Sequence, residues 1–204
     1  MEILKLTDIK QAAKILDDER VLAFPTETVY GVGVIFDSKL AFERLVEIKR
    51  RPPNKPFSLM CATLEQAFEY IQIGEREKKV MKSFLPGEVT FLVKAKDELP
   101  EHVTLGTKII GIRVPQSQFV EVLIAEVGKP LLVTSANKSG EPTTRFFEDV
   151  VKTYGEELPA TVKGECESLI PTTIVNLAED DTITLVREGP VPFEKIKTLW
   201  EETK

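Results

Sequence analysis

Residues 21–36, VLAFPTETVYGVGVIF, are the stretch that decides the fold. Two apolar runs rich in β-branched and aromatic residues flank the polar segment PTET, and such runs are typical of buried strands. Thr26, Glu27 and Thr28 therefore place hydroxyls and a carboxylate between two buried strands. Polar groups in such a position must be hydrogen-bonded or face a cavity. The stretch predicts two strands joined by a polar turn that is either satisfied internally or part of a site.

Helices and strands alternate on both sides of this stretch. Apolar residues at helical spacing predict helices over residues 9–16, 40–48, 119–127 and 193–200, and helical segments are predicted over 63–84. Further strands are predicted at residues 57–61, 89–95, 109–115, 131–136, 172–177 and 183–188. No Gly/Ser-rich linker or internal repeat interrupts the pattern. The sequence therefore predicts one α/β domain over residues 1–204, built on a twisted, mostly mixed β-sheet flanked by helices.

Composition excludes several classes of function. His102, in the polar stretch DELPEHVTLG, is the only histidine, which argues against Ser-His-Asp, Cys-His and multi-histidine sites. Cys61 and Cys166 are the only cysteines and lie far apart in the sequence, so no Cys-x-x-Cys site exists. A net charge of −6 argues against tight, sequence-independent nucleic-acid binding, although it leaves room for a local basic patch. No segment approaches the roughly 18 apolar residues that a membrane span requires. We therefore expect a cytoplasmic protein without a membrane segment.

The two common glycine-rich nucleotide loops are also excluded. Gly31 and Gly33 begin a dinucleotide fingerprint, but Phe36 occupies its third glycine position, and no GxxxxGK[ST] sequence exists. A nucleotide would therefore be held by scattered side chains. The basic segment 49–55, KRRPPNK, suits phosphate oxygens, and its alternative is a solvated helix end favoured by the helix dipole.

Two further positions carry polar groups at the ends of apolar strands. The turn 134–140, TSANKSG, follows a strand of the kind whose carboxyl end borders ligands in α/β sheets, and its alternative is a simple strand-to-loop turn. Arg113 ends the strand IGIRVP, where a buried guanidinium needs an anionic partner. That partner is either a substrate carboxylate or an internal Asp or Glu.

Six segments in sequence order resemble the YrdC family of threonylcarbamoyl-AMP synthases. They are PTETVYGVG, the Lys-x-Arg of Lys49 and Arg51, PGEVTFLVKA, IGIRVP, the Ser-x-Asn of Ser135 and Asn137, and VREG at 186–189. The resemblance extends from about residue 22 to residue 189 and corresponds to the short form of the family. It implies an α/β fold with a positively lined cavity in which ATP, L-threonine and bicarbonate yield threonylcarbamoyl-AMP and pyrophosphate. A separate transferase complex would then modify adenosine 37 of tRNA, forming N6-threonylcarbamoyladenosine (t6A).

The resemblance also implies roles for individual residues. The nucleotide would be lined by Lys49, Arg51, Lys55, Ser135, Asn137, Thr143 and Arg187, of which Lys49, Arg51, Ser135 and Asn137 would also act in catalysis. Threonine would be bound by Thr28, Met60, Arg113 and Thr172. Glu27 is the nearest candidate for a general base. Mg²⁺ would accompany ATP, held by phosphate oxygens and water, because the sequence shows no carboxylate cage and hence no metal ligands of its own.

Three positions depart from the family pattern. Met60 stands where many relatives have histidine, Thr172 where serine is usual, and Asn176 where aspartate is common. Threonine keeps the hydroxyl of serine, whereas methionine removes a hydrogen-bond donor. The choice between threonine and serine as substrate is therefore left open.

Other functions remain as alternatives. The stretches FSLMCATLEQA and PTTIVNLAEDDTITLVREG also resemble the paralogous YciO branch. A carbamoyltransferase role like that of the related domain in hydrogenase maturation proteins is disfavoured, because no acylphosphatase or zinc-finger segment accompanies the domain. A weak contact with tRNA or double-stranded RNA in an electropositive cavity, with or without catalysis, is the alternative from a different class.

Overall fold

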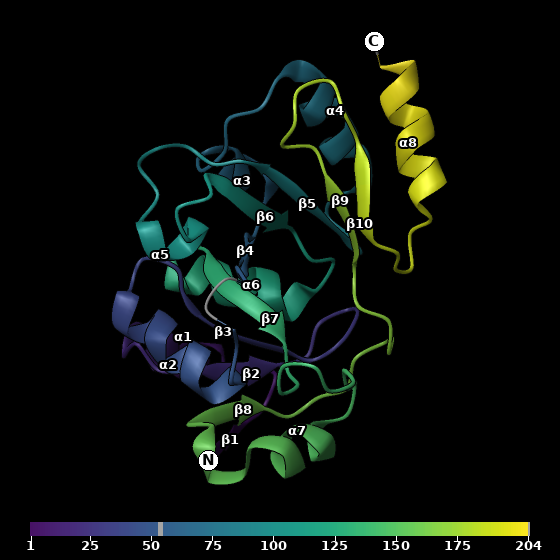
Figure 1. Ribbon diagram of the computed structural model, residues 1–204. Coiled ribbons are helices and arrows are strands. Elements are labelled where there is room, and N and C mark those ends of the chain that lie inside the picture. The colour runs from purple at the N-terminus through teal and green to yellow at the C-terminus, as the bar shows by residue number, and fades with distance from the viewer. Residues whose placement is uncertain (53–54, 204) are drawn as a thin grey trace.

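A mixed β-sheet runs through the length of the molecule, with helices around it (Figure 1). The computed structural model describes residues 1–52 and 55–203. Within these residues ten strands form one sheet in the order β1-β8-β2-β3-β7-β4-β6-β5-β9-β10. The strands are β1 (Glu2–Leu4), β2 (Leu22–Phe24), β3 (Gly31–Ile35), β4 (Ser58–Met60), β5 (Val89–Lys94), β6 (Ile109–Arg113), β7 (Leu131–Ser135), β8 (Ala160–Val162), β9 (Thr173–Asn176) and β10 (Thr184–Arg187).

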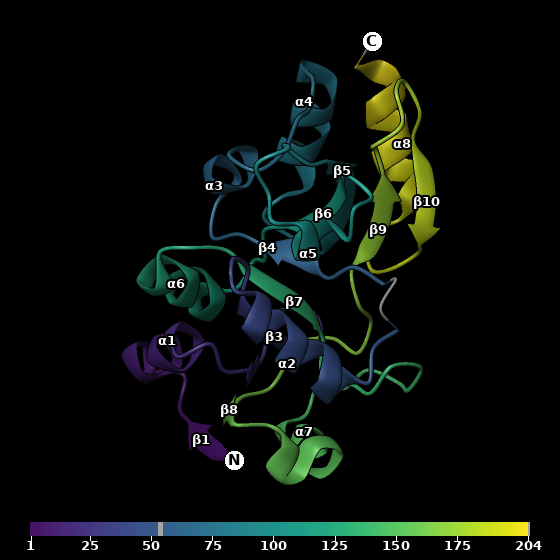
Figure 2. The same ribbon diagram turned by 60° about the vertical axis from the view of Figure 1, so that its left-hand side comes forward.

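The helices connect these strands in chain order. They are α1 (Ile9–Asp17), α2 (Lys39–Lys49), α3 (Leu64–Phe68), α4 (Glu75–Phe84), α5 (Glu101–Thr104), α6 (Gln118–Val127), α7 (Phe147–Tyr154), the 3₁₀ helix η1 (Gly155–Glu157) and α8 (Phe193–Glu202). Helix α1 packs against α6, α2 against β3, and α4 against α8. Figures 1 and 2 show the two chain ends at opposite ends of the molecule. None of the described helices is both long and apolar enough to cross a membrane.

Strand directions confirm the predicted mixed sheet and the α/β fold class. Strands β2, β3, β7 and β4 pair antiparallel in that order, whereas β4 runs parallel to β6, and β5 runs parallel to β9. The stretch 21–36 supplies β2 and β3, which are buried throughout. A Cβ atom on Gly33 would lie 2.8 Å from Leu132 O of β7, so this close approach of two strands requires glycine.

The helical segments predicted over 63–84 are confirmed as α3 and α4. Between them Ile71 forms an antiparallel bridge with Ala95 at the end of β5, which separates the two helices. The predicted helix at 119–127 exists as α6, but Val122 of the predicted apolar face is exposed. Val120 and Ile124 are buried in its place, so the buried face is rotated from the predicted one.

Candidate active site

A cavity of about 330 Å³ lies over one face of the central strands. Because side chains alternate between the faces of a strand, mostly every second residue of neighbouring strands lines it, and Thr134 of β7 is an exception. These residues are Ser58 and Met60 on β4, Thr90 and Leu92 on β5, Gly111 and Arg113 on β6, and Val133 and Ser135 on β7. A Cβ atom on Gly111 would lie 3.2 Å from Ser58 Oγ, so the absence of a side chain at this position leaves space in the cavity.

The lining of this cavity is strongly positive. Arg51, Lys55, Arg113 and Arg187 line it, and no Asp or Glu is found among the described residues that do. Burial lowers the pKa of Arg51, and burial together with the positive charge of Arg113 lowers that of Arg187. Cations that are partly desolvated and close to one another are stabilised by an anion between them. The cavity therefore suits a ligand that carries several negative charges.

One end of the cavity is formed by Arg113 and the turn between β2 and β3. Arg113 Nη2 donates to Glu27 Oε1 at 2.9 Å, to Thr28 Oγ1 at 2.6 Å and to Thr26 Oγ1 at 3.2 Å. All four side chains are buried. The hydroxyls of Thr26 and Thr28 are thus satisfied internally, and in this structure the anionic partner of Arg113 is Glu27. Val29 and Tyr30, which follow directly, line the cavity.

This buried ion pair still has hydrogen-bonding capacity. Arg113 Nε and Glu27 Oε2 have no hydrogen-bond partner among the described residues. Unpaired polar atoms at buried positions are costly, and they are often explained by a ligand or a water. A molecule with both a carboxylate and an amino group has the complementary atoms.

The opposite wall of this end is formed by two threonines and an arginine. Thr90 Oγ1 and Thr172 Oγ1 are 2.9 Å apart, within hydrogen-bonding distance. Arg187 donates to Thr172 O through Nε at 3.0 Å and through Nη2 at 2.7 Å. Arg187 on the edge strand β10 therefore holds the segment before β9 in place while it lines the cavity.

Arg51 is fixed at the other end of the cavity. Its Nε donates to Lys55 O at 2.9 Å and its Nη2 to Pro56 O at 2.7 Å, while the guanidinium carbon lies 4.6 Å from the centroid of the Phe57 ring. The alternative of a solvated helix end describes Arg50, which is exposed. Pro53 and Asn54 of the predicted phosphate-binding segment lie outside the described residues.

Lys49 is buried behind the cavity. Its side-chain amine donates to Ser135 O at 2.6 Å and also to Asn137 O. Burial, followed by the positive charges of Arg51 and Lys138, lowers the pKa of this amine to about 7. The Ser-x-Asn loop closes on itself as well, since Ser135 Oγ donates to Asn137 Oδ1 at 2.6 Å.

The structure brings most of the predicted site residues together. Those that line the cavity are Arg51, Lys55, Met60, Arg113, Ser135, Thr172 and Arg187. Lys49, Thr28 and Asn137 lie behind it and bond to lining residues. Thr143 is outside the lining and donates to Leu169 O at 3.1 Å. The individual roles of all these residues stay predictions.

Sequence reasoning missed several residues of the cavity, among them Thr90 and Gly111. Thr90 is predicted only as part of a strand, although a threonine inside an otherwise apolar strand is a signal for a polar contact. Gly111 is not among the predicted site residues either, although an isolated glycine in a strand often marks a close approach by a ligand or by another backbone. Both signals were present in the sequence, but neither says which face of the sheet is open.

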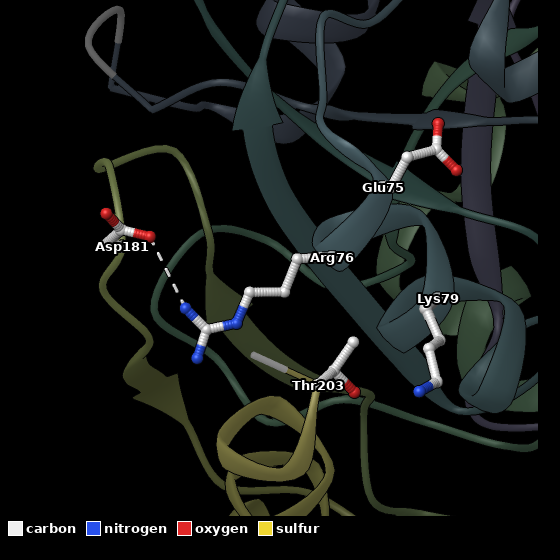
Figure 3. Close-up of a pocket in the computed structure, with 5 residues that line it drawn as sticks. All are labelled: Glu75, Arg76, Lys79, Asp181 and Thr203. Atoms are coloured by element: carbon white, nitrogen blue, oxygen red, sulfur yellow. Dashed lines mark hydrogen bonds and ion pairs between the residues drawn. The ribbon is translucent and has the colours of Figure 1, made fainter.

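A larger cavity of about 890 Å³ lies at the other end of the sheet, between α4 and α8. Its charges are mixed, and Figure 3 shows Arg76 extending toward Asp181, with Glu75 and Lys79 placed apart from them. Arg76 Nε and Nη2 donate to Trp200 O at 3.1 and 2.8 Å, and the guanidinium carbon lies 3.8 Å from the centroid of the Trp200 ring. Arg76 therefore holds the end of α8, and this cavity is a structural junction.

Replacing Arg76 with alanine is expected to destabilise the fold by about 2 kcal/mol, because charged hydrogen bonds and a cation–π contact are lost. For a chain of this size the change corresponds to a fall in Tm of roughly 4–8 °C. Thermal unfolding of the variant, measured by circular dichroism, checks this. Arg76→Lys should fall between the two, and an unchanged Tm in Arg76→Ala would show that α8 is held by its apolar face alone.

A cavity lined by three arginines and a lysine on one face of a mixed sheet defines an α/β protein suited to an anionic ligand. The chain belongs to the Sua5/YciO/YrdC family, whose model, described as telomere recombination, matches residues 14–189. The chain is 37% identical to a threonylcarbamoyl-AMP synthase from Enterobacter sp. (strain 638) over 172 residues, which cover 83% of this chain and 90% of the relative.

Two solved structures share the fold. Sua5 of P. abyssi, complexed with L-threonine, matches with a TM-score of 0.91 and 28% identity, covering 98% of this chain. The chain spans 61% of the length of that Sua5. YciO of E. coli matches with a TM-score of 0.87 and 28% identity, covering 96% of this chain and 98% of YciO. The predicted family resemblance and the predicted YciO-like character are both confirmed.

Proposed function

We propose that this chain is a threonylcarbamoyl-AMP synthase that combines ATP, L-threonine and bicarbonate. The observation that carries the proposal is the cavity itself, which joins a cluster of cations to the Arg113–Glu27 pair. The cations suit a triphosphate, and the ion pair suits an amino acid. The name of the Enterobacter relative and the threonine bound to P. abyssi Sua5 support the same assignment.

The proposed chemistry places threonine beside Arg113. The amino acid and bicarbonate form a carbamate with release of water and one proton, for which the free Oε2 of Glu27 is a nearby acceptor. Thr28 and Thr172 supply hydroxyls to the same end. Met60, which is opposite Arg113 in the strand register, offers an apolar surface that favours threonine, with its methyl group, over serine.

The nucleotide then reacts at its α-phosphate. A carbamate oxygen attacks the α-phosphorus, the bond to the β-phosphate oxygen breaks, and pyrophosphate leaves, which makes the enzyme a nucleotidyltransferase. Arg51, Lys55 and Arg187 neutralise the charge that develops on the phosphate oxygens. In this proposal Ser135, Asn137, Lys49 and Thr143 position the nucleotide at the loop after β7.

Mg²⁺ belongs to the same proposal. The described residues that line the cavity offer hydroxyls and cations but no carboxylate. A lining without carboxylates fits a magnesium ion that arrives with ATP and keeps phosphate oxygens and water as its ligands, since Mg²⁺ prefers oxygen donors and retains water. When bound, the ion would neutralise charge on the triphosphate.

The first test is pyrophosphate release by the purified protein with ATP and Mg²⁺, bicarbonate and one amino acid at a time. We expect release that requires both threonine and bicarbonate, together with a labile threonine-containing AMP adduct on chromatography. Serine in place of threonine should give at most about a tenth of the rate, because a buried methyl group contributes on the order of 1–3 kcal/mol to discrimination. Nucleotide binding without threonine-dependent release would contradict the proposal.

The second candidate is a YciO-like function without synthase activity, which is favoured by the match to E. coli YciO over nearly its whole length. The partners also belong to the proposal. A complex that transfers the threonylcarbamoyl group to tRNA would consume the product, and any direct contact with tRNA or double-stranded RNA would be weak. That role would place the protein in the cytoplasm.

A further inference from the structure

Two lysines reach in opposite directions across the contact between the end of α2 and the loop after β7. From α2, Lys49 donates to Ser135 O and Asn137 O. From the loop, Lys138 donates to Ile48 O at 3.0 Å. Each segment thus supplies a lysine amine that donates to the backbone carbonyls of the other.

The loop serves as a cap for α2. The last carbonyls of a helix have no partner within the helix and carry its negative dipole end. Lys138 Nζ bonds to Ile48 O, and the backbone N–H of Ser139 donates to Lys49 O at 3.2 Å. The loop and the helix end are therefore fixed to each other by backbone groups that would otherwise be unpaired.

Lys138 also contacts a third segment of the chain, formed by the end of α7 and by η1. Its amine donates to Glu157 Oε2 at 2.6 Å and lies 4.7 Å from the centroid of the Tyr154 ring. The Lys138 side chain is 11% exposed, whereas that of Glu157 is 48% exposed. Glu157 of the short helix η1 is therefore connected to the loop by its hydrogen bond with the buried Lys138.

The position of Lys138 affects the cavity through its neighbours in the loop. Asn137 Nδ2 donates to Lys138 O at 3.0 Å and to Glu141 O at 2.7 Å. Asn137 Oδ1 in turn accepts the hydrogen bond from Ser135 Oγ, and Ser135 lines the cavity. A shift of Lys138 would move the hydroxyl and amide groups of residues 135–137 together.

We propose that Lys138 and Glu157, which do not line the cavity, are positioning residues that hold the loop of residues 135–137 against the end of α2 in the arrangement that receives the nucleotide. The ligand named here rests on the proposed function. The amino-acid end of the cavity is built around Arg113, which bonds to the turn 26–28. The effect of Lys138 therefore belongs to the nucleotide and not to the amino acid.

The test compares Lys138→Met with Lys152→Met. Lys152 is exposed on α7, so the control removes the same charge from the neighbouring helix. Lys138→Met is expected to raise the KM for ATP about tenfold, since small displacements of positioning groups have effects of this order. The KM for threonine should stay within about twofold of the native value. Lys138→Arg, which keeps the charge and the donors, should restore most of the ATP affinity.

Hydrogen exchange provides a readout that does not depend on activity. The amides of residues 134–141 should exchange faster in Lys138→Met than in Lys152→Met or the native chain. Glu157→Gln keeps Lys138 and its bond to Ile48 O, so the amides of residues 134–141 should show a smaller increase in exchange. This variant still tests the inference if Lys138→Met does not fold. If both Lys138→Met and Glu157→Gln match the control in loop exchange, the inference is overturned. A native chain without threonine-dependent turnover would overturn the proposed function alone, and the exchange comparison would still decide the role of Lys138.

Discussion

Replacing Arg113 with methionine is expected to raise the KM for threonine by a factor between about 30 and several thousand, because truncating one partner of a desolvated, hydrogen-bonded charge pair costs roughly 2–5 kcal/mol. Arg113 is the only cation bonded to the turn 26–28 among the described residues. Its guanidinium can bind a carboxylate through two N–H groups, which no methionine can replace. Steady-state kinetics with varied threonine at saturating ATP measure the change.

A second variant separates binding from folding. Arg113→Met leaves the Glu27 carboxylate buried without its ion-pair partner, and such a change alone destabilises a protein by about 3–5 kcal/mol. Arg113→Met combined with Glu27→Gln removes both charges and should recover much of the lost stability. The double variant should still bind threonine poorly. A near-native KM for threonine in the double variant would show that the amino acid binds elsewhere.

The PTET turn shows how far the sequence could predict this site. Burial of its polar groups could be predicted, because the flanking runs are those of buried strands, and the two outcomes of internal satisfaction and cavity lining followed from that burial. In the structure the two hydroxyls are satisfied internally, since Thr26 and Thr28 bond to Arg113. The cavity lining next to them is formed by Val29, Tyr30 and Arg113 and not by residues 26–28. The choice of Glu27 as the internal partner of Arg113 could not be predicted. These two residues are 86 positions apart, and only the sheet order brings them together.

Lys49 shows what the sequence could not predict about the site. The Lys-x-Arg spacing and the family resemblance pointed to a phosphate site, but they did not indicate that the amine is buried among backbone carbonyls.

Some short secondary-structure elements could not be predicted either. β1 and β8 have three residues each, too few to show a period, and α7 buries only Val150 and Tyr154. Their place in the fold depends on long-range pairing, of β1 with β8 and of β8 with β2.

The depressed pKa of Lys49 predicts how stability depends on pH. Burial and the nearby charges of Arg51 and Lys138 lower this pKa from 10.5 to about 7, while Glu141 opposes the shift. Between those values the unfolded chain binds a proton that the folded chain does not bind. The contribution of Lys49 to the free energy of unfolding therefore rises with pH across that window, and its full penalty is present below about pH 7.

Nucleotide binding should reverse this shift, because phosphate charge close to the amine favours its protonated form. At pH 8 we expect ATP binding to take up close to one proton, measured by calorimetry in buffers of different ionisation enthalpy.

Lys49→Met should remove that uptake and lower turnover by more than about tenfold, since the carbonyl groups of Ser135 and Asn137 lose their buried donor. Lys55→Met, which removes an exposed cation from the cavity, is the matched control and should keep the uptake. Equal proton uptake in native protein and Lys49→Met would show that the bound triphosphate is not close enough to the Lys49 amine to change its pKa. Lys49 would then act only as the anchor of the loop after β7.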